Sequence, residues 1–536
     1  MKIHLKTRCW LTALVAGFVL LLGSQTRAQT FASFYNFPAA ATNQNGVWTN
    51  QFGLLPSGAQ LLLGSTLYGT TARGGPNGAG CIYAVGTNGL GFTNLYVFST
   101  LVTNKSGIAT NRDGANPAGG LVVAGSTLYG VNLYGGTNGG GTLFSLSTNG
   151  TGFTTLHQFA AGATNAATGL FTNREGATPF GGLTLSGAKL YGTTGFGGTN
   201  GNGTVFAVQT NGVGFTNLHT FSILVSSNNS DGANPYATLT LAGNTLYGTT
   251  QFGGTNGNGT VFSLTTNGNA FTDLHSFGRV ADWATGPYAN IFTNGDGANP
   301  RAQVILVGNT IYGTGTFGGL YGNGTVFALA ANGTSFTNLH NFAVGGLDLD
   351  QSDFDDFGSI TNTDGAWPQA GVTLWNNTLY GVCEYDGLGL GTLFSLGTNG
   401  GNFTVVHYFP AGSTGTLLPG YADNPNSGGA YPQTSLMVSD GVFYSSSAFG
   451  GLGGSGTLFS LSVGAASITP PLAIIPSGTN VLVSWPTNLT GYALYSTTNL
   501  APAVWSIVSQ RPGIVAGQYV VTNGHSASHM FYRLSQ

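Results

Sequence analysis

Seven copies of one sequence unit constrain this chain more than any other feature. Each copy carries a tyrosine in a segment related to LYGTT, and a proline stands 12 residues before that tyrosine in every copy. A second aromatic residue follows 15 residues after the tyrosine in six copies and 14 residues after it in the sixth. A repeat of fixed spacing indicates a repeat architecture more strongly than local propensity does. The marker tyrosines are Tyr68, Tyr129, Tyr191, Tyr247, Tyr312, Tyr380 and Tyr444.

Each unit contains four short segments that are typical of β-strands. In the third unit these are GGLTLSG, KLYGTT, TVFAVQT and GFTNLHTF, rich in Val, Thr, Phe and Tyr and separated by glycine-containing turns. We find no segment with helical periodicity. Four antiparallel strands in each of seven consecutive units predict an all-β fold, a seven-bladed β-propeller.

The last unit lacks its fourth strand. Six units end in a segment of the form FTxLHxF, but the seventh stops at LSVGAAS, and the related segment FASFYNF stands at residues 31–37 instead. In a closed ring, an N-terminal strand can complete the last blade and so remove an exposed sheet edge. The permutation therefore favours a closed propeller over an open solenoid.

The repeats resemble a known family. The units LYGTTGFGGTNGNGTVFAVQTNG (190–212) and LYGTTQFGGTNGNGTVFSLTTNG (246–268) are similar to the Gloeo/Verruco, or GloVer, tandem repeats of secreted bacterial proteins. The resemblance covers roughly residues 31–463. It implies an exported bacterial protein with a variable C-terminal attachment module, and it implies no established activity and no catalytic residues.

The chain divides into three parts by sequence. Residues 1–28 combine basic residues with a short apolar run and a small residue at the end, which predicts a secretory signal peptide. Residues 29–466 form the predicted propeller. After a proline-containing linker, residues 467–536 show further strand patterns and predict a small C-terminal β-sandwich, a candidate attachment or sorting module. No later segment is long and apolar enough for a membrane helix.

The composition excludes nucleic acid as a partner. Charged residues make up only 5% of the chain, and loss of the signal peptide leaves 9 basic residues against 16 acidic ones, a charge of −7. Such a chain offers no basic stripe to a phosphate backbone. Although it contains 90 glycines, its 12% aromatic residues and regular alternation indicate a packed β protein. Cys81 and Cys383 fall in non-adjacent units, so we expect two buried thiols without a disulfide.

Two sets of repeated polar residues have structural interpretations. A carboxylate precedes the proline in DGANP-like segments, where it can ring the channel mouth or, as we favour, accept N–H groups in a tight turn. A histidine recurs in the last strand of five units, too far around the rim to share a metal ion with the others. The residues are Asp113, Glu175, Asp231, Asp296 and Asp364, and His157, His219, His275, His340 and His407.

Aromatic residues recur in the glycine-rich loop that follows the marker tyrosine. They stack on sugar rings if they are exposed, or they pin the loop to its neighbour if they are buried, and we favour pinning. These residues are Tyr134, Phe196, Phe252, Phe317, Tyr385 and Phe449, with Arg73 in the same position of the first unit.

An acidic insertion distinguishes the region between the fifth and sixth units. The segment GGLDLDQSDFDDFGS places oxygen-bearing side chains at alternating positions, as calcium loops do, although it lacks the glycine and final glutamate of an EF-hand. The alternatives are a calcium site and a solvated acidic loop. The candidate ligands are Asp348, Asp350, Ser352, Asp353 and Asp355.

Three functions remain open from the sequence. The first is a non-catalytic module that binds an extracellular polysaccharide or protein, assisted by calcium, with Trp283, Tyr288, Tyr385 and Trp367 as candidate ligand-binding residues. The second is a structural surface spacer. The third is a glycoside hydrolase or polysaccharide lyase, which requires carboxylates on both sides of one bond; its candidates are Asp364, Glu384 and Asp386. We rank the binding module first, and oligomeric state is left open.

Overall fold

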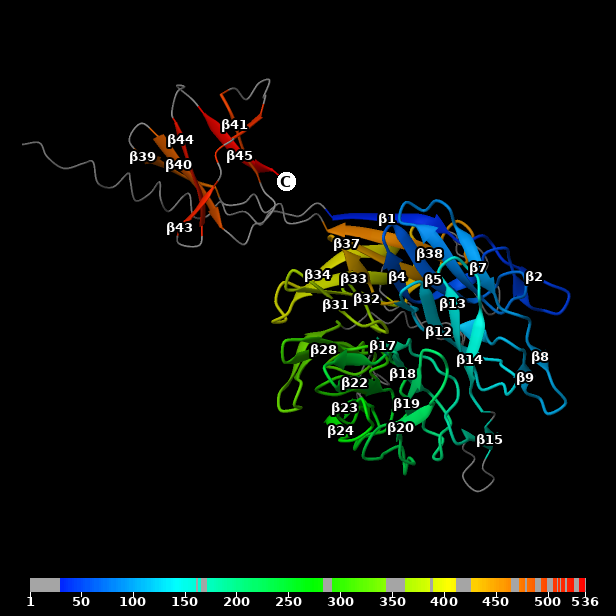
Figure 1. Ribbon diagram of the computed structural model, residues 1–536. Coiled ribbons are helices and arrows are strands. Elements are labelled where there is room, and N and C mark those ends of the chain that lie inside the picture. Colours follow the sequence, from blue (N-terminus) through cyan, green and yellow to red (C-terminus); the bar gives the residue numbers. More distant parts are fainter. Residues whose placement is uncertain are drawn as a thin grey trace, which may run out of the picture. The chain divides into compact units, whose positions relative to one another are not determined.

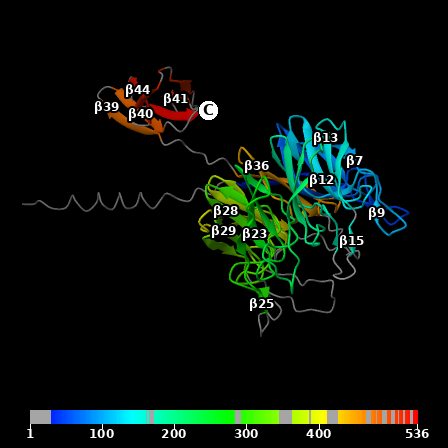
Figure 2. The same ribbon diagram turned by 60° about the horizontal axis from the view of Figure 1, so that its bottom comes forward.

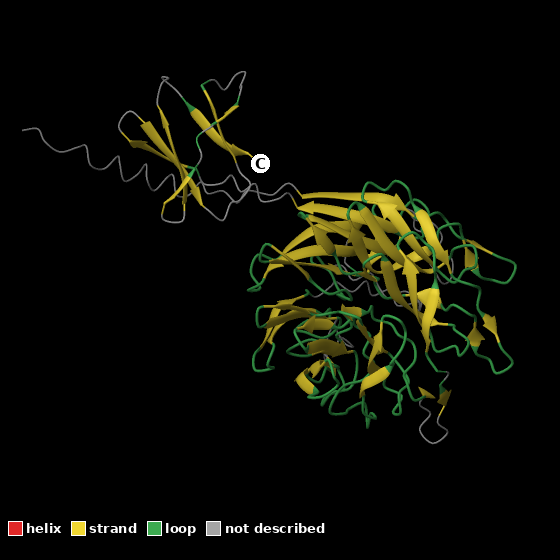
Figure 3. Ribbon diagram, viewed as in Figure 1, coloured by secondary structure: helices red, strands yellow, loops and turns green. Residues whose placement is uncertain are grey.

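The chain forms two compact units, which are described separately. The computed structural model describes residues 29–160, 162–164, 171–282, 292–343, 362–385, 389–410 and 426–463, and then 472–477, 480–486, 493–498, 505–508, 510, 512–515, 518–524 and 530–535. The first unit extends from Thr30 to Ser462, and the second contains Val463–Gln536. In the described residues all regular secondary structure is β-strand (Figure 3).

The first unit consists of seven antiparallel sheets, which we number as blades 1 to 7 in chain order. Blades 1 to 3 contain β4 (Leu54–Leu63), β5 (Thr66–Arg73), β6 (Cys81–Gly86) and β7 (Thr93–Val97); β10 (Ala115–Pro117), β11 (Val122–Ala124), β12 (Thr127–Tyr134), β13 (Thr142–Ser147) and β14 (Thr154–Gln158); and β17 (Thr184–Ser186), β18 (Lys189–Thr194), β19 (Thr204–Gln209) and β20 (Thr216–Thr220).

Blades 4 to 7 repeat this arrangement. They contain β21 (Thr240–Ala242), β22 (Thr245–Thr250), β23 (Thr260–Thr265) and β24 (Thr272–Ser276); β27 (Ile305–Val307), β28 (Thr310–Gly315), β29 (Thr325–Ala330) and β30 (Phe336–Asn341); β31 (Thr373–Trp375), β32 (Thr378–Cys383), β33 (Gly389–Gly397) and β34 (Thr404–Pro410); and β35 (Ala430–Pro432), β36 (Met437–Ser439), β37 (Val442–Phe449), β38 (Thr457–Val463) and β1 (Gln29–Asn36).

Short two-stranded ribbons lie in the connections between several blades. They are β2 (Ala41–Thr42) with β3 (Trp48–Thr49), β8 (Val102–Thr103) with β9 (Ala109–Thr110), β15 (Ala163–Thr164) with β16 (Phe171–Thr172), and β25 (Ala281–Asp282) with β26 (Phe292–Thr293).

The hydrophobic core lies between neighbouring blades. Between blades 2 and 3, Leu143 and Phe159 pack with Leu190 and Phe206, and all four side chains are fully buried. The same positions pack together at five further interfaces, including the one between blades 7 and 1. Because a blade's sheet is buried on the faces that meet its neighbours, its third strand is buried along most of its length, as in Thr204–Gln209, where five of the six residues are buried.

The repeated proline and glycine meet at every interface between blades. A Cβ on Gly203 of blade 3 would lie 2.2 Å from the Thr194 carbonyl oxygen and 2.8 Å from Cδ of Pro235 in blade 4. Only glycine fits this approach, which explains why the glycine loop and the proline recur together. The residue before the proline donates its N–H to the previous blade, as Asn234 does to the Asn202 carbonyl at 2.9 Å.

The same contacts close the ring. A Cβ on Gly456 of blade 7 would lie 2.5 Å from Cδ of Pro56 in blade 1, and the Leu55 N–H donates to the Ser455 carbonyl at 3.1 Å. Strand β1 pairs with β38 as the outermost strand of blade 7 (Figure 1). A second view shows the blades following one another in chain order (Figure 2). The structure is a seven-bladed β-propeller closed by its N-terminal strand, as the sequence predicts.

The second unit is a small β-sandwich. One sheet has the order β39 (Ala473–Ser477), β40 (Asn480–Pro486), β44 (Gln518–Gly524) and β43 (Gly513–Val515). The other has the order β42 (Ser506–Ile507), β41 (Ala493–Thr497) and β45 (Phe531–Ser535). Val483, Trp485 and Val521 of the first sheet pack against Leu494 of the second, and this core confirms the predicted sandwich.

Both cysteines of the propeller are buried thiols, as expected. Cys81 lies in β6 and Cys383 in β32, each without exposed surface. The part of the chain that the structure describes contains no helix long and apolar enough to cross a membrane.

Candidate functional site

A cavity of 1020 Å³ occupies the central channel of the propeller, and residues of all seven blades line it. One residue per blade, directly after the repeated proline, stands at the end of the channel nearest the glycine loops. We call these seven residues the entrance ring. They are Ser57, Ala118, Phe180, Tyr236, Arg301, Gln369 and Gln433.

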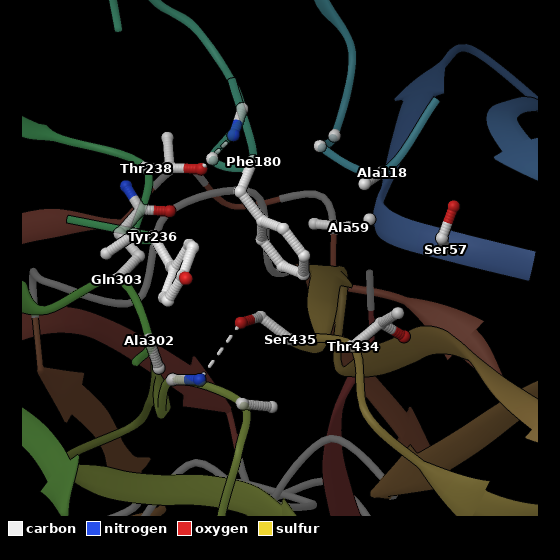
Figure 4. Close-up of a pocket in the computed structure, with 18 of the residues that line it drawn as sticks. Ser57, Ala59, Ala118, Phe180, Tyr236, Thr238, Ala302, Gln303, Thr434 and Ser435 are labelled. Carbon is white, nitrogen blue, oxygen red and sulfur yellow. Dashed lines mark hydrogen bonds between the residues drawn. The ribbon is translucent and has the colours of Figure 1, made fainter. Parts of the chain in front are cut away.

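The entrance ring is unequal around its circumference. Blades 1 and 2 contribute the small residues Ser57 and Ala118, whereas blades 3 and 4 contribute Phe180 and Tyr236. Figure 4 shows both aromatic rings projecting into the cavity, and their centroids are 5.1 Å apart in an edge-to-face arrangement. The cavity is therefore open on the side of blades 1 and 2 and has an aromatic wall on the side of blades 3 and 4.

The wall below the entrance ring is built by close contacts between innermost strands. The Gly182 N–H donates to Thr238 Oγ1 at 2.7 Å, and the Gly371 N–H donates to Ser435 Oγ at 3.1 Å (Figure 4). A Cβ on Gly181 would lie 2.5 Å from the Ala237 carbonyl oxygen. Because adjacent blades are bonded together here, the wall is a rigid support for the entrance ring.

A chain of polar side chains crosses blades 5, 6 and 7. Arg301 Nη1 donates to Gln369 Oε1 at 3.3 Å, and its guanidinium lies 5.9 Å from the centroid of the Tyr236 ring. The Gln369 amide donates to one oxygen of Glu384, and the Gln433 amide donates to the other. We call Arg301, Gln369, Glu384 and Gln433 the polar chain. It ties the Arg301 cation to the Glu384 carboxylate through one intervening amide.

Glu384 is a buried acid. Its side chain is 6% exposed, and burial raises its pKa to about 7, although the amides of Gln433 and Gln369 and the charge of Arg301 oppose this shift. The same burial lowers the pKa of Arg301, which still remains charged. Glu384 therefore changes its charge near neutral pH, next to the channel entrance.

A row of aromatic residues borders the polar chain on blades 5 to 7. Each ring contacts the next edge-to-face, with centroid distances of 5.2, 4.8, 5.1 and 5.7 Å. The row consists of Phe317, Trp367, Tyr385, Tyr431 and Phe449. It contains two of the four predicted ligand-binding residues, Trp367 and Tyr385.

Two members of this row have an unusual backbone. Trp367 and Tyr431 precede the repeated proline with φ of 57° and 54°. Asn116, Asn234 and Asn299 occupy the same position in other blades, and asparagine tolerates this left-handed conformation better than bulky residues do. Leu55 and Thr178 have the same conformation in blades 1 and 3, so the left-handed backbone belongs to the repeat, and what distinguishes blades 6 and 7 is the aromatic side chain placed there.

The glycine-loop aromatics fall into two groups. Phe317, Tyr385 and Phe196 contact an aromatic ring of the next blade, which agrees with the pinning interpretation, whereas Phe449 packs on Tyr431 of its own blade. In blades 2 to 4 these residues also keep exposed surface: Tyr134 is 46% exposed, and Phe196 and Phe252 are each 40% exposed. Pinning therefore accounts for only part of the set.

The repeated carboxylates and histidines meet each other at the outer rim. Asp231 accepts hydrogen bonds from His219 Nε2 at 2.9 Å and from the Ser222 N–H, and the His219 ring stacks on Phe271 of the next blade at 3.9 Å. We call this arrangement the blade latch. The carboxylates therefore do not ring the channel. Similar pairs are His157–Glu175, His275–Asp296 and His340–Asp364, and in blade 1 the Tyr96 hydroxyl donates to Asp113.

Two blade interfaces lack the latch, and both carry a compensating change. After blade 6, Pro410 has no N–H to donate, and Gly428 stands where other blades have the carboxylate. His407 there stacks on Phe31 at 3.5 Å, and burial lowers its pKa to about 4. After blade 7, Pro38 again has no N–H, and Phe52 replaces the carboxylate. At each blade interface, the latch carboxylate and the backbone N–H that can donate to it are therefore either both present or both absent.

The sequence matches one family. The profile of the Gloeobacter/Verrucomicrobia repeat matches residues 49–222, 167–293 and 220–417, which together cover residues 49–417. The chain belongs to the Gloeobacter/Verrucomicrobia repeat family. A comparison with curated proteins finds no match.

Solved structures similar to this family member are β-propellers. The nidogen/laminin complex chain is 14% identical over 58% of this chain and 93% of its own, with a TM-score of 0.32. An oligogalacturonate lyase in complex with manganese is 11% identical over 82% of this chain and 98% of its own (TM-score 0.42). TolB from Acinetobacter baumannii is 11% identical over 60% and 58% (TM-score 0.31). The similarity concerns the fold alone.

Several predicted site residues lie outside the described residues. These are Trp283, Tyr288 and Asp386, and the candidate calcium ligands Asp348, Asp350, Ser352, Asp353 and Asp355. Of the candidate catalytic carboxylates, Asp364 belongs to a blade latch, where it accepts from His340 and the Ala343 N–H, and Glu384 belongs to the polar chain. Within the described part of this repeat protein, no group of three or more His, Cys, Asp and Glu residues is arranged to hold a metal ion.

None of the seven entrance-ring residues is among the sites predicted from the sequence. A signal was present, because the position after the repeated proline is the most variable one in an otherwise regular stretch of this Gloeobacter/Verrucomicrobia repeat. Variation on a rigid scaffold marks binding positions.

Proposed function

We propose that this propeller is an exported or cell-surface, non-catalytic binding module for an extracellular polysaccharide, and that the ligand binds at the channel entrance. The observation that carries the proposal is the unequal entrance ring. It combines the aromatic rings of Phe180 and Tyr236, the polar chain and an open side above a cavity of 1020 Å³. Saccharides present apolar ring faces and many hydroxyls, and a site with aromatic faces and convergent amides suits both.

Binding suits this site better than hydrolysis. Hydrolysis of a glycosidic bond requires two carboxylates about 5–10 Å apart across one cleft. Of the candidate carboxylates that the structure describes, Asp364 is bonded within a latch and Glu384 accepts two amide donors in the polar chain. The two acids thus belong to separate hydrogen-bond sets, and each already has its donors.

The test uses a variant that fills the open side of the channel. Ala118→Trp adds a large side chain where the entrance ring is small, and Val213→Trp places the same side chain in an exposed turn of blade 3, where Val213 is 61% exposed. Both proteins are run against a polysaccharide panel, with retained protein and released reducing ends measured together.

We expect the parent and Val213→Trp to be retained by the same polysaccharides, and Ala118→Trp to lose retention. Release of reducing ends by the parent would replace the binding proposal with an enzyme. No retention and no release across the panel would favour a structural spacer.

The proposal includes assistance by calcium at the acidic insertion, on the evidence of its sequence alone. Carboxylate and hydroxyl oxygens at alternating positions suit this cation. Chelation is then expected to weaken retention of the polysaccharide, and added calcium is expected to restore it. Retention that is unchanged by chelator would leave the insertion as a solvated acidic loop.

A further inference from the structure

Arg301 is a cation without a direct anionic partner. In the part of the chain that the structure describes, it makes no ion pair, and its guanidinium contacts the neutral Gln369 oxygen and the Tyr236 ring. It is half-buried, and its guanidinium is desolvated enough that its pKa is lowered. A guanidinium has five N–H donors in a planar fork, which match a carboxylate in two parallel hydrogen bonds.

The neighbours of Arg301 arrange it for a ligand in the cavity. Tyr236 lies beside the guanidinium, and Phe180 lies beside Tyr236, so that an aromatic surface leads to the cation. On the other side, Gln369 orients its oxygen toward Arg301 and its amide toward Glu384. Gln303, two residues after Arg301 in the same blade, also lines the cavity.

We propose that the polysaccharide bound at the entrance is acidic. Its carboxylate binds Arg301 and replaces the Gln369 contact that links Arg301 to Glu384. This inference rests on the proposed function and specifies the ligand class for the same site. The sugar ring that carries the carboxylate lies against Phe180 and Tyr236, and the open side above Ser57 and Ala118 accommodates the rest of the chain.

Glu384 couples this binding to pH. When it is ionised, it offsets the Arg301 charge and repels an incoming carboxylate. When it is protonated, the positive charge of Arg301 is unbalanced and attracts the ligand. A uronate carboxylate remains ionised at pH 5.5, so acidic saccharide binds more tightly below the pKa of Glu384, which is about 7, than above it.

The other groups that face Glu384 do not titrate in this range. Tyr385 and Tyr431 adjoin it, and burial raises the pKa of both phenols, so both stay neutral. The pKa of Tyr236 is also raised by burial. Asp386 follows in the sequence and lies outside the described residues. Among the described residues at the entrance, Glu384 is therefore the group that changes its charge in this pH range.

The experiment compares acidic and neutral forms of one saccharide. The ligands are hexamers of 1,4-linked glucuronate, mannuronate and galacturonate and the same hexamers as methyl esters, titrated calorimetrically into the full mature chain at pH 5.5 and pH 8.5. The variants are Arg301→Gln, Glu384→Gln and, as a matched loss of one exposed charge at the outer rim, Arg112→Gln.

We expect at least one acidic hexamer to bind, and methyl esterification or Arg301→Gln to weaken it by about tenfold or more. Glu384→Gln is expected to remove the pH dependence, and Arg112→Gln to bind like the parent. The esterified ligand keeps the test valid even if Arg301→Gln does not fold.

Two results would overturn the inference, and only the first of them is compatible with the proposed function. If a hexamer and its methyl ester bind equally well and Arg301→Gln has no effect, the entrance binds sugar without its carboxylate, and only the proposed function survives. If neither these hexamers nor neutral polysaccharides are retained, both proposals fail.

Discussion

Glu384 shows how one residue can depart from a repeat. The same position in the other blades is occupied by Ala72, Leu133, Gly195, Gln251, Thr316 and Ala448, none of which ionises. A carboxylate buried there is hydrogen-bonded by two glutamines that belong to two blades. Because its charged form is poorly solvated, its titration must affect the stability of the whole propeller.

Replacing Glu384 with Gln is expected to change how stability depends on pH. The pKa of Glu384 is raised from 4.5 to about 7 in the folded protein, so the stability linked to its neutral form is fully present below pH 4.5 and is lost as the pH rises to 7. The loss amounts to about 3 kcal/mol. Glu384→Gln should lack this decline and be more stable than the parent at pH 8.

Urea unfolding at pH 5 and pH 8 measures the effect. A parent and a variant that lose stability in parallel between these pH values would show that Glu384 is not the buried acid we describe. His407 provides an internal contrast, because its lowered pKa of about 4 links a loss of stability to falling pH rather than to rising pH.

In blade 1, Tyr83 and Gln60 both replace apolar residues of the repeat, and the two polar side chains contact each other. Other blades place Phe at the first position and Leu or Val at the second, as Phe144 and Leu121 illustrate. Here the Tyr83 hydroxyl donates to Gln60 Oε1 at 2.8 Å, and both side chains are buried. Gln60 Nε2 has no hydrogen-bond partner in the structure.

Tyr83→Phe should therefore destabilise the protein by about 1–2 kcal/mol, because it leaves Gln60 Oε1 without its hydrogen-bond donor in the core. The double variant Tyr83→Phe/Gln60→Leu should recover this loss, since it recreates the apolar pair of the other blades. Denaturant unfolding of both variants tests the pairing. A double variant less stable than the single one would show that the polar pair stabilises blade 1 in its own right.

The blade latch acts at the level of the strand. It joins the end of an outermost strand to the segment that leads into the next blade, using one carboxylate for both an imidazole and a backbone N–H. His219 and Asp231 come from opposite sides of the interblade connection. The latch therefore fixes the path of that connection from the rim toward the channel.

Removing the latch carboxylate should be costly. Asp231→Ala leaves the Ser222 N–H and the His219 ring without their acceptor at a largely buried site, and we expect a loss of about 2–3 kcal/mol. Asp231→Asn should lose less, because its amide oxygen still accepts from Ser222. Thermal unfolding of the two variants provides the measurement, and two variants equal in stability to the parent would refute a role for the latch.

The latch was visible in the sequence only in part. The sequence predicts that the repeated carboxylates and the repeated histidines are structural, but it does not pair them, because the connection between them varies in length from blade to blade. The decisive clue lies in the exceptions. Pro38 and Pro410 replace the N–H donor at the two interfaces whose carboxylate is missing, and this correlation requires a shared partner.

For the whole molecule, spacing alone predicted the architecture. The constant distance between proline and tyrosine, and the displaced strand at residues 31–37, were enough to expect seven blades and a closed ring. The entrance ring was harder to predict, because a channel residue is defined by its blade position rather than by a motif. Sequence could identify the position after each proline as variable, but only the structure shows Arg301, Gln369 and Gln433 bonded in one chain with Glu384.

Deleting residues 29–37 should open the ring. The deletion removes β1 from the edge of β38 and the fully buried Phe37 from the interface with blade 1. Loss of Phe37 alone is expected to cost about 3–5 kcal/mol. A synthetic peptide of residues 29–38 should restore part of the melting temperature by pairing with β38. A truncated protein that melts like the parent would contradict closure by this strand.

The most direct test of the account is a crystal structure of the propeller soaked with a uronate hexamer at pH 5.5. We predict that a uronate ring lies against Phe180 and Tyr236, with its carboxylate on the Arg301 guanidinium and Gln369 turned away from that cation. A hexamer found at the outer rim or on the C-terminal sandwich, with an empty channel entrance, would contradict the account.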